Sequence, residues 1–253
     1  MYEYRGLQDV LFMTLYWMVA FIALLAAVYL LFRRRNVFMH EDEPEEEPRP
    51  YGLAMRSSLR LRRWTAVLLV TMAASHVWWY AIGQWWLADD WLVRTILVIM
   101  LDHATLVPLV MGVLLAMLQD HRRPLWPWLL VQLPVVMIPI AVMDEPNMFY
   151  GYEFPHYYQL AMCVAFVVYY IIALRQYGRW LLDNYADLER KEVWQSLLFA
   201  VVLFAVYMIY TSNMGEMARE YLSQVISIVI IAFFVWRVET LQELPSEEDM
   251  KVY

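Results

Sequence analysis

Three ionisable side chains lie inside long apolar runs of the sequence: His76 in one run, and Asp102 with His103 in the next. Polar side chains are costly to bury in the hydrocarbon of a bilayer, so such residues are functional candidates. At about 1.5 Å per helical residue, His76 lies roughly 18 Å from Trp64, where its run begins. By the same measure, Asp102 lies roughly 16 Å from Trp91, at the start of the next run. Both side chains are therefore expected near the middle of the membrane.

A short tryptophan-rich segment joins these two runs, so their helices are expected to be antiparallel neighbours with His76 in reach of Asp102 or His103. The protonation of a paired Asp and His would respond to a local field or to a ligand. Two histidines could also ligate a metal or a haem iron, and the same residues could simply hold two helices together. We treat the three as a candidate polar switch inside the membrane and predict no catalytic residue, no metal and no cofactor.

Other familiar chemistry has no residues to carry it out. The only lysines are Lys191 and Lys251, so the last apolar run has none for a retinal Schiff base. The sequence contains neither His-Glu-x-x-His nor Gly-x-Ser-x-Gly. Its single cysteine, Cys163, permits neither a disulfide nor a cysteine-based metal site within the chain. An enzyme is therefore not expected.

The composition indicates a membrane protein. Of the 253 residues, 62% are apolar and 18% are charged, whereas soluble domains have about half and a quarter. The apolar residues gather in runs near the 20 residues or so that a hydrocarbon core of about 30 Å requires. The expected fold is all-α, a polytopic membrane bundle of seven transmembrane helices. These are expected at residues 8–32, 64–82, 92–118, 125–143, 156–174, 195–213 and 218–236.

The placement of positive charge orients the expected helices. With the N-terminus outside, sixteen of the 19 Lys and Arg residues fall on the inner side, and only Arg5, Arg94 and Arg219 fall on the outer side. Cytoplasmic segments of membrane proteins carry such an excess. The N-terminus is therefore expected outside and the C-terminus in the cytoplasm, with residues 1–237 forming the membrane domain and 238–253 a juxtamembrane tail.

The longest expected outer connection, residues 144–156, mixes aromatic side chains with carboxylates. That mixture suits a lid over a pocket, or equally a plug of aromatic side chains at the membrane interface. The candidate residues of this outer pocket or lid are Asp144, Glu145, Tyr150, Tyr152, Glu153 and His156.

Two inner segments differ in character. The loop 36–63 opens with an acidic, proline-rich stretch that should be disordered, and closes with a basic stretch that should lie on the membrane as a short amphipathic helix. Residues 175–194 contain no proline, so the helix before them should persist past the membrane. They are either a relay to a cytoplasmic partner or a plain helical hairpin. The candidate relay residues are Asp183, Asn184, Tyr185, Asp187, Glu189 and Trp194.

Residues 177–196 read Tyr-Gly-Arg-Trp-Leu-Leu-Asp-Asn-Tyr-Ala-Asp-Leu-Glu-Arg-Lys-Glu-Val-Trp-Gln-Ser, and residues 236–242 read Trp-Arg-Val-Glu-Thr-Leu-Gln. Both stretches resemble segments of bacterial regulators that place a multi-span membrane sensor domain before an AraC-type helix-turn-helix DNA-binding domain. The resemblance implies a sensor in the bacterial cytoplasmic (inner) membrane. The chain departs from that pattern by ending at Tyr253, where the DNA-binding domain should begin, so it is not itself expected to bind nucleic acid.

Three functions stay open from the sequence. The first is a membrane-embedded sensory domain that relays an envelope or membrane signal to a cytoplasmic transcription-regulating output, either a separate partner or a DNA-binding domain beyond Tyr253. The second is a non-catalytic membrane scaffold or subunit of a complex. The third is a small transporter or membrane enzyme that uses His76, Asp102 and His103. A homodimer would suit a regulator, although no pair of glycines spaced for close helix packing marks an interface.

Overall fold

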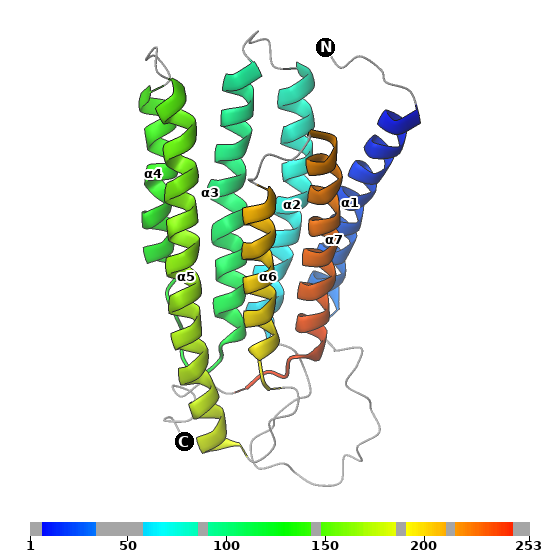
Figure 1. Cartoon of the computed structure of the whole chain (residues 1–253). Helices are drawn as coiled ribbons and strands as arrows, with labels where there is room; N and C mark the ends of the chain where they lie inside the picture. Colours follow the sequence, from blue (N-terminus) through cyan, green and yellow to red (C-terminus); the bar gives the residue numbers. More distant parts are fainter. Residues whose placement is uncertain are drawn as a thin grey trace.

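The computed structural model describes residues 7–33, 58–85, 91–142, 148–185, 191–210 and 216–244. These residues form α-helices that run alternately up and down as an antiparallel bundle (Figure 1). The helices are α1 (Leu7–Phe32), α2 (Leu59–Trp85), α3 (Trp91–Met117), α4 (Trp126–Val142), α5 (Met148–Asn184), α6 (Trp194–Tyr210) and α7 (Glu216–Thr240). Over the described ranges the chain is therefore all-helical, as its apolar runs predict.

Five of these helices are long and apolar enough to cross a membrane, judged by length and composition. The five stretches are Val10–Phe32, Leu59–Ile82, Met100–Met117, Tyr157–Asn184 and Glu220–Thr240. In α4 and α6 the apolar parts are shorter, at Trp126–Ile138 and Trp194–Leu203. The described residues thus indicate a membrane protein with five candidate spans.

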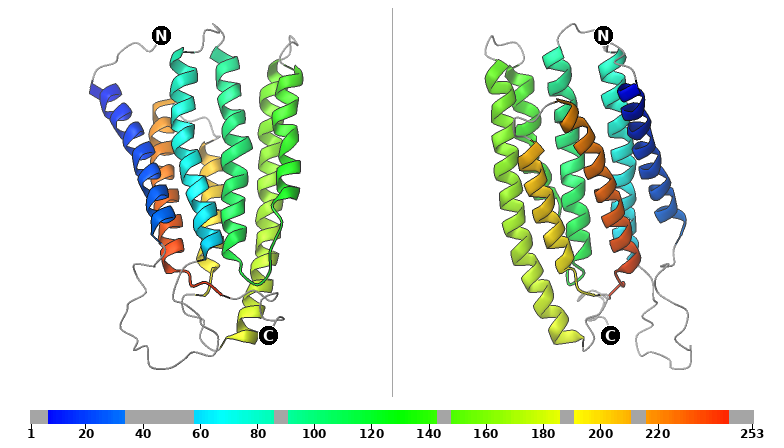
Figure 2. Two further views of the ribbon diagram at one scale, coloured as in Figure 1. Left: turned by 180° about the vertical axis from the view of Figure 1, so that it is seen from behind. Right: turned by 45° about the vertical axis from the view of Figure 1, so that its right-hand side comes forward.

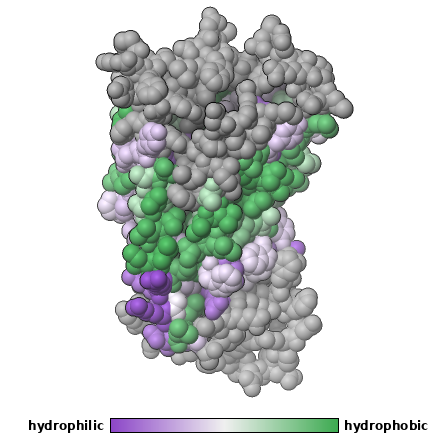
Figure 3. Space-filling model, in the orientation of Figure 1, coloured by the Kyte–Doolittle hydropathy of each residue, from purple (hydrophilic) through white to green (hydrophobic). Residues whose placement is uncertain are grey.

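The surface of the bundle agrees with a membrane location. Large apolar side chains of α1 point outward, with Leu11 56% exposed, Phe21 59% and Leu25 52%. Figure 3 shows apolar side chains gathered across the middle of one face, with hydrophilic ones toward its lower end. Such a broad apolar surface would be unfavourable in water, whereas lipid tails would cover it without cost.

Each expected helix has an observed counterpart, and the differences lie at the helix ends. The second helix begins at Leu59 rather than at residue 64, so part of the basic stretch expected to lie flat on the membrane continues into α2. The fifth helix already begins at Met148, inside the stretch 144–156 that was expected to be a loop. One proline, Pro155, is tolerated there because membrane helices can find other partners for the carbonyl that proline leaves free. The predicted continuation of this helix beyond residue 174 is confirmed as far as Asn184.

Neighbours in the sequence pack beside one another, and the last helix returns to the first. Consecutive helices from α1 to α6 are in contact, α3 also touches α5, and α7 packs on α1 and α2. Figure 2 shows α7 beside α1 in both views. On its other side α7 meets α6 through the rings of Phe199 and Phe233, which stack with centroids 3.8 Å apart.

Gly112 allows the indole of Trp64 to sit between α2, α3 and the start of α4. A Cβ atom at residue 112 would lie 2.9 Å from the Trp64 ring and 3.2 Å from a methyl group of Leu125. Real Cβ atoms essentially never come within 3.0 Å of another atom, so a larger residue would force the Trp64 indole or the helix backbone to move.

Replacing Gly112 with Ala should therefore lower stability by about 1–3 kcal/mol, since overpacking outweighs the better helix propensity of Ala. The matched control is Gly178→Ala in α5, where no atom lies within 4 Å of the added Cβ. That variant should gain up to about 1 kcal/mol, because Gly disfavours a helix interior. Thermal unfolding of both purified variants in one detergent checks the pair, and a gain of stability in both would contradict this packing.

Candidate functional site

Asp102 on α3 lies against one turn of α2 that offers three hydrogen-bond donors. Ser75 Oγ donates to Asp102 Oδ1 over 2.6 Å, and Trp78 Nε1 donates to the same oxygen over 3.0 Å. Trp79 Nε1 donates to Oδ2 over 2.6 Å. The donors fall on one face of α2 because residues three and four apart are helical neighbours. Both carboxylate oxygens are thereby hydrogen-bonded inside a candidate span.

His76 points to a different side of α2 and contacts α7 and α1. Its Nδ1 atom lies 2.8 Å from the carbonyl oxygen of Met72, and its Nε2 atom lies 3.1 Å from Oε1 of Gln224 on α7. From α1, Tyr16 donates its hydroxyl to the His76 carbonyl oxygen over 2.6 Å. The rings of Tyr16 and His76 are 4.6 Å apart. His76 and Gln224 are both buried, so this contact joins three helices within the bundle.

The structure therefore separates two of the side chains that the sequence suggested could meet. Consecutive residues on a helix point about 100° apart, so Ser75 rather than His76 faces Asp102. Both ring nitrogens of His76 are occupied by Met72 and Gln224. The candidate switch thus consists of two contacts on two faces of α2.

A third polar contact runs from the backbone carbonyl of His103 on α3 through α4 to α5. Gln132 on α4 donates through Nε2 to the His103 carbonyl oxygen and to Oε1 of Gln159, each over 2.7 Å. Gln159 in turn donates to Cys163 Sγ over 3.7 Å. Gln132 and Gln159 were not among the candidates from the sequence, and Gln224 was not expected to pair with His76. An amide within an otherwise apolar run was the signal that could have found them.

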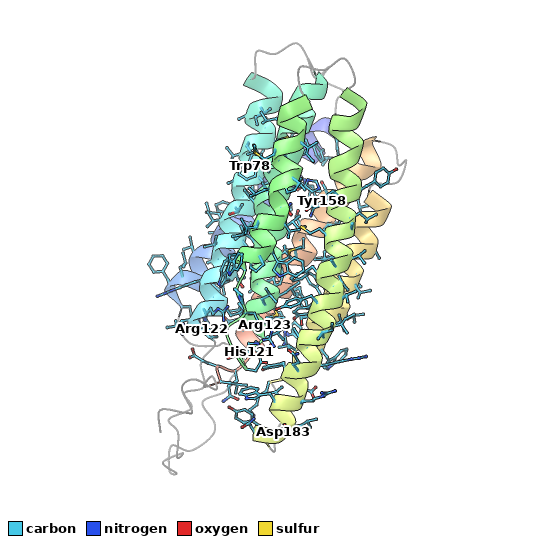
Figure 4. All side chains as sticks on the ribbon, turned by 90° about the vertical axis from the view of Figure 1, so that its left-hand side faces the viewer. Trp78, His121, Arg122, Arg123, Tyr158 and Asp183 are labelled. Carbon is cyan, nitrogen blue, oxygen red and sulfur yellow. The ribbon has the colours of Figure 1, made fainter. Side chains whose placement is uncertain are left out.

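The lower end of the bundle holds buried charges, and we call it the basic end. It lies where α1, α3, α5 and α7 finish, and Figure 4 labels His121, Arg122 and Arg123 there. Arg62 at the start of α2 forms an ion pair with Glu239 near the end of α7, with 3.1 Å between Nη2 and Oε1. These side chains are only 3% and 2% exposed. Arg62 also donates to the Arg33 carbonyl oxygen that follows α1.

The exit of α7 is bound at two further points. Arg237, itself buried, donates through Nη2 to the carbonyl oxygen of Glu192 over 2.7 Å. Gln119, just after α3, donates to the Gln242 carbonyl oxygen and accepts from the Leu244 amide, each over 2.8 Å. Buried contacts thus hold the segment from Arg237 to Leu244 to three other parts of the chain.

The other helix ends are connected in the same region. Asp120 accepts from Arg123 Nη2 over 2.8 Å and lies 2.9 Å from Nδ1 of His121. On α5, Tyr177 donates to the Lys191 carbonyl oxygen over 3.0 Å. Arg237 on α7 donates to the carbonyl oxygen of the next residue, Glu192. Helices α5 and α7 therefore both bind the short stretch before α6.

Of the candidate relay residues, Tyr185 makes the contacts that link separate parts of the chain. Its ring lies 5.6 Å from the ring of Trp180 and 5.6 Å from Lys191 Nζ. Asn184 bonds only to its own helix, at the Trp180 carbonyl oxygen. Asp183 and Trp194 are exposed.

Several other candidates cannot be placed. Asp187, Glu189, Asp144 and Glu145 lie outside the described residues. The remaining outer candidates belong to α5, but the structure describes only their backbone: Tyr150, Tyr152, Glu153 and His156.

Among the described side chains, no group of three or more His, Cys, Asp and Glu is arranged to hold a metal. No family model, curated protein or solved structure matches the chain. The resemblance of residues 177–196 and 236–242 to membrane-bound regulators therefore stays a prediction. The Arg237–Glu192 hydrogen bond does bring these two stretches together.

Asp102 allows a test of its role as a shared acceptor. Asp102→Leu should lower the free energy of unfolding by about 1–3 kcal/mol or more, because the hydroxyl of Ser75 and two indole N–H groups lose their acceptor. Asp102→Asn keeps one acceptor oxygen and should lower the free energy of unfolding clearly less than Asp102→Leu does. Unfolding in mixed micelles, followed by tryptophan fluorescence, compares the two variants. Equal losses would mean that the negative charge matters and the acceptor does not.

The Arg62–Glu239 pair allows a test by a double-mutant cycle. Arg62→Met or Glu239→Leu alone should cost about 3–5 kcal/mol, because each leaves one buried charge without its partner. Replacing both residues together should restore most of that stability, since apolar side chains can fill the same space. Unfolding of the three variants and the unchanged protein gives the coupling energy, and additive losses would contradict a direct pair.

Proposed function

We propose that this chain is a seven-span sensory domain of a bacterial inner membrane that relays a membrane or envelope signal to a cytoplasmic transcription-regulating output. Its N-terminus would lie outside and its basic end in the cytoplasm. The output would be a cytoplasmic regulatory partner or a DNA-binding domain beyond Tyr253. The observation that carries this proposal is the attachment of the α7 exit to the ends of several other helices.

The attachments give the exit of α7 a way to respond to the rest of the bundle. Glu239 binds Arg62 of α2, Gln242 and Leu244 bind Gln119 after α3, and Arg237 binds the stretch before α6. A shift of any of these elements must carry the exit with it or break a buried contact. Because breaking a buried ion pair costs several kcal/mol, such a region favours discrete arrangements, as a switch requires.

The alternation of the helices supports seven spans and an inner basic end. In Figure 1 the two short helices lie among the long ones and alternate in direction with them, each over part of the depth of the bundle. Helices α4 and α6 have 17 residues each and would span about 25 Å, slightly less than a hydrocarbon core of about 30 Å. Irregular backbone at their ends would be acceptable where it is buried in protein. The excess of arginine at the basic end supports a cytoplasmic location.

Gln119→Ala tests the relay, because it removes both side-chain hydrogen bonds to the segment after α7. We expect this variant to change the same transcripts as deletion of the gene, while its level in the membrane stays normal. Gln176→Ala is the matched control, since Gln176 is exposed on α5 near the same end, and it should behave as the unchanged protein. Transcript profiles of the four strains make the comparison.

One result of the transcript comparison and one result of a separate topology test would contradict the proposal. Unchanged transcripts in the deletion strain would rule out a regulatory output, and co-purification of a stable complex would then favour a scaffold or subunit.

An epitope tag after Tyr253 reports the orientation in the same cells. Digestion of that tag by protease added to cells with a permeabilised outer membrane but an intact inner membrane would contradict a cytoplasmic C-terminus.

A further inference from the structure

Four arginines of the basic end fall into two groups. Arg62 and Arg123 are buried and pair with Glu239 and Asp120. Arg60 is half-buried and Arg122 is exposed, and no carboxylate among the described residues pairs with either of them. The second group therefore carries positive charge that the described part of the protein leaves uncompensated.

Arg60 and Arg122 come from different elements and converge. Arg60 lies one turn before Trp64 on α2. The side chains of Trp64 and Leu125 both lie close to Gly112, so this face of α2 turns toward the end of α3 and the α3–α4 connection. Nη2 of Arg60 lies 3.5 Å from the carbonyl oxygen of Arg123, the residue that directly follows Arg122. Figure 4 shows Arg122 and Arg123 together beside the lower end of α2. An anion between the two guanidinium groups would relieve their repulsion.

The depth of this place in the membrane indicates which anion it would meet. Each arginine precedes a tryptophan by four residues, Trp64 for Arg60 and Trp126 for Arg122. Trp126 opens α4 and is 61% exposed. Tryptophan side chains gather at the level of the lipid headgroups, so in a bilayer the guanidinium groups would lie at the level of the lipid phosphates. The planar guanidinium group binds phosphate oxygens in pairs.

We propose that Arg60 and Arg122 form a binding site for the phosphate of an anionic phospholipid headgroup, with the acyl chains lying toward Trp126. This inference rests on the membrane location of the chain but not on its relay function, so one can fail without the other. Arg63, exposed one turn from Arg60, would add charge at the edge of the site. A lipid held there would bridge the start of α2 and the α3–α4 connection.

Native mass spectrometry of the full chain, reconstituted with phosphatidylglycerol or with phosphatidylcholine, tests this site. The unchanged protein should retain more phosphatidylglycerol than phosphatidylcholine. Arg60→Gln with Arg122→Gln should weaken that retention about tenfold or more, since each loses charge-assisted hydrogen bonds. The control is Arg175→Gln with Arg179→Gln, two exposed arginines of α5 that carry the same total charge. This control should retain the lipid.

Lysine variants keep the test valid if the glutamine variant folds poorly. Arg60→Lys with Arg122→Lys preserves the charge but loses the paired geometry, and it should show a smaller but distinct loss of phosphatidylglycerol. No preference for phosphatidylglycerol in the unchanged protein would overturn the proposal, as would an equal loss in the Arg175 and Arg179 control. Displacement of the lipid by millimolar inorganic phosphate would overturn the lipid assignment and leave a site for free phosphate.

Discussion

The arrangement of this bundle depends on one constraint: a polar group buried among apolar helices needs a partner from the protein, because hydrocarbon offers none. Apolar surfaces alone do not hold membrane helices in a given order, since lipid tails are as apolar as leucine. Here the partners come from other helices, as Asp102 finds Ser75 and Gln132 finds Gln159. Each such contact specifies which helices are neighbours and how each is rotated about its axis.

Helix α2 has a central place in this arrangement, because it contacts α7 at two levels. His76 meets Gln224 in the middle of the bundle, and Arg62 meets Glu239 at the basic end. The two points lie roughly 21 Å apart along α2. Two helices joined at two separated points resist rotation against each other. In the proposed relay, a disturbance at Asp102 on α3, which contacts the neighbouring face of α2, would reach the end of α7 through the α2–α7 pair.

The sequence predicted the helices better than it predicted their contacts. The thickness of a bilayer sets the length of an apolar run, so the helices could be located from the sequence. Hydropathy does not detect the part of a helix that extends beyond its apolar run, and the part of α5 that begins at Met148 is such an extension. Asp102 stood out because it is ionisable. Its partners Trp78 and Trp79 did not, because tryptophan is expected near interfaces anyway. A helix that is apolar nearly all round has no periodicity to fix its rotation, so the pairing of His76 with Gln224 could not be predicted.

The same limit explains how the sequence described the positive charges. Counted along the chain, the arginines indicate only which end of each helix faces the cytoplasm. The structure separates buried arginines from exposed ones. The buried Arg62 and Arg123 each have a carboxylate partner, Glu239 from a distant part of the chain and Asp120 from three residues earlier. Arg62 is buried because Glu239, 177 residues later, neutralises it. Arg122 has no such acceptor among the described residues and stays at the surface. Arg62 is one of the positive charges from which the sequence predicts the orientation, and it also holds the exit of α7, so a substitution at Arg62 would change both.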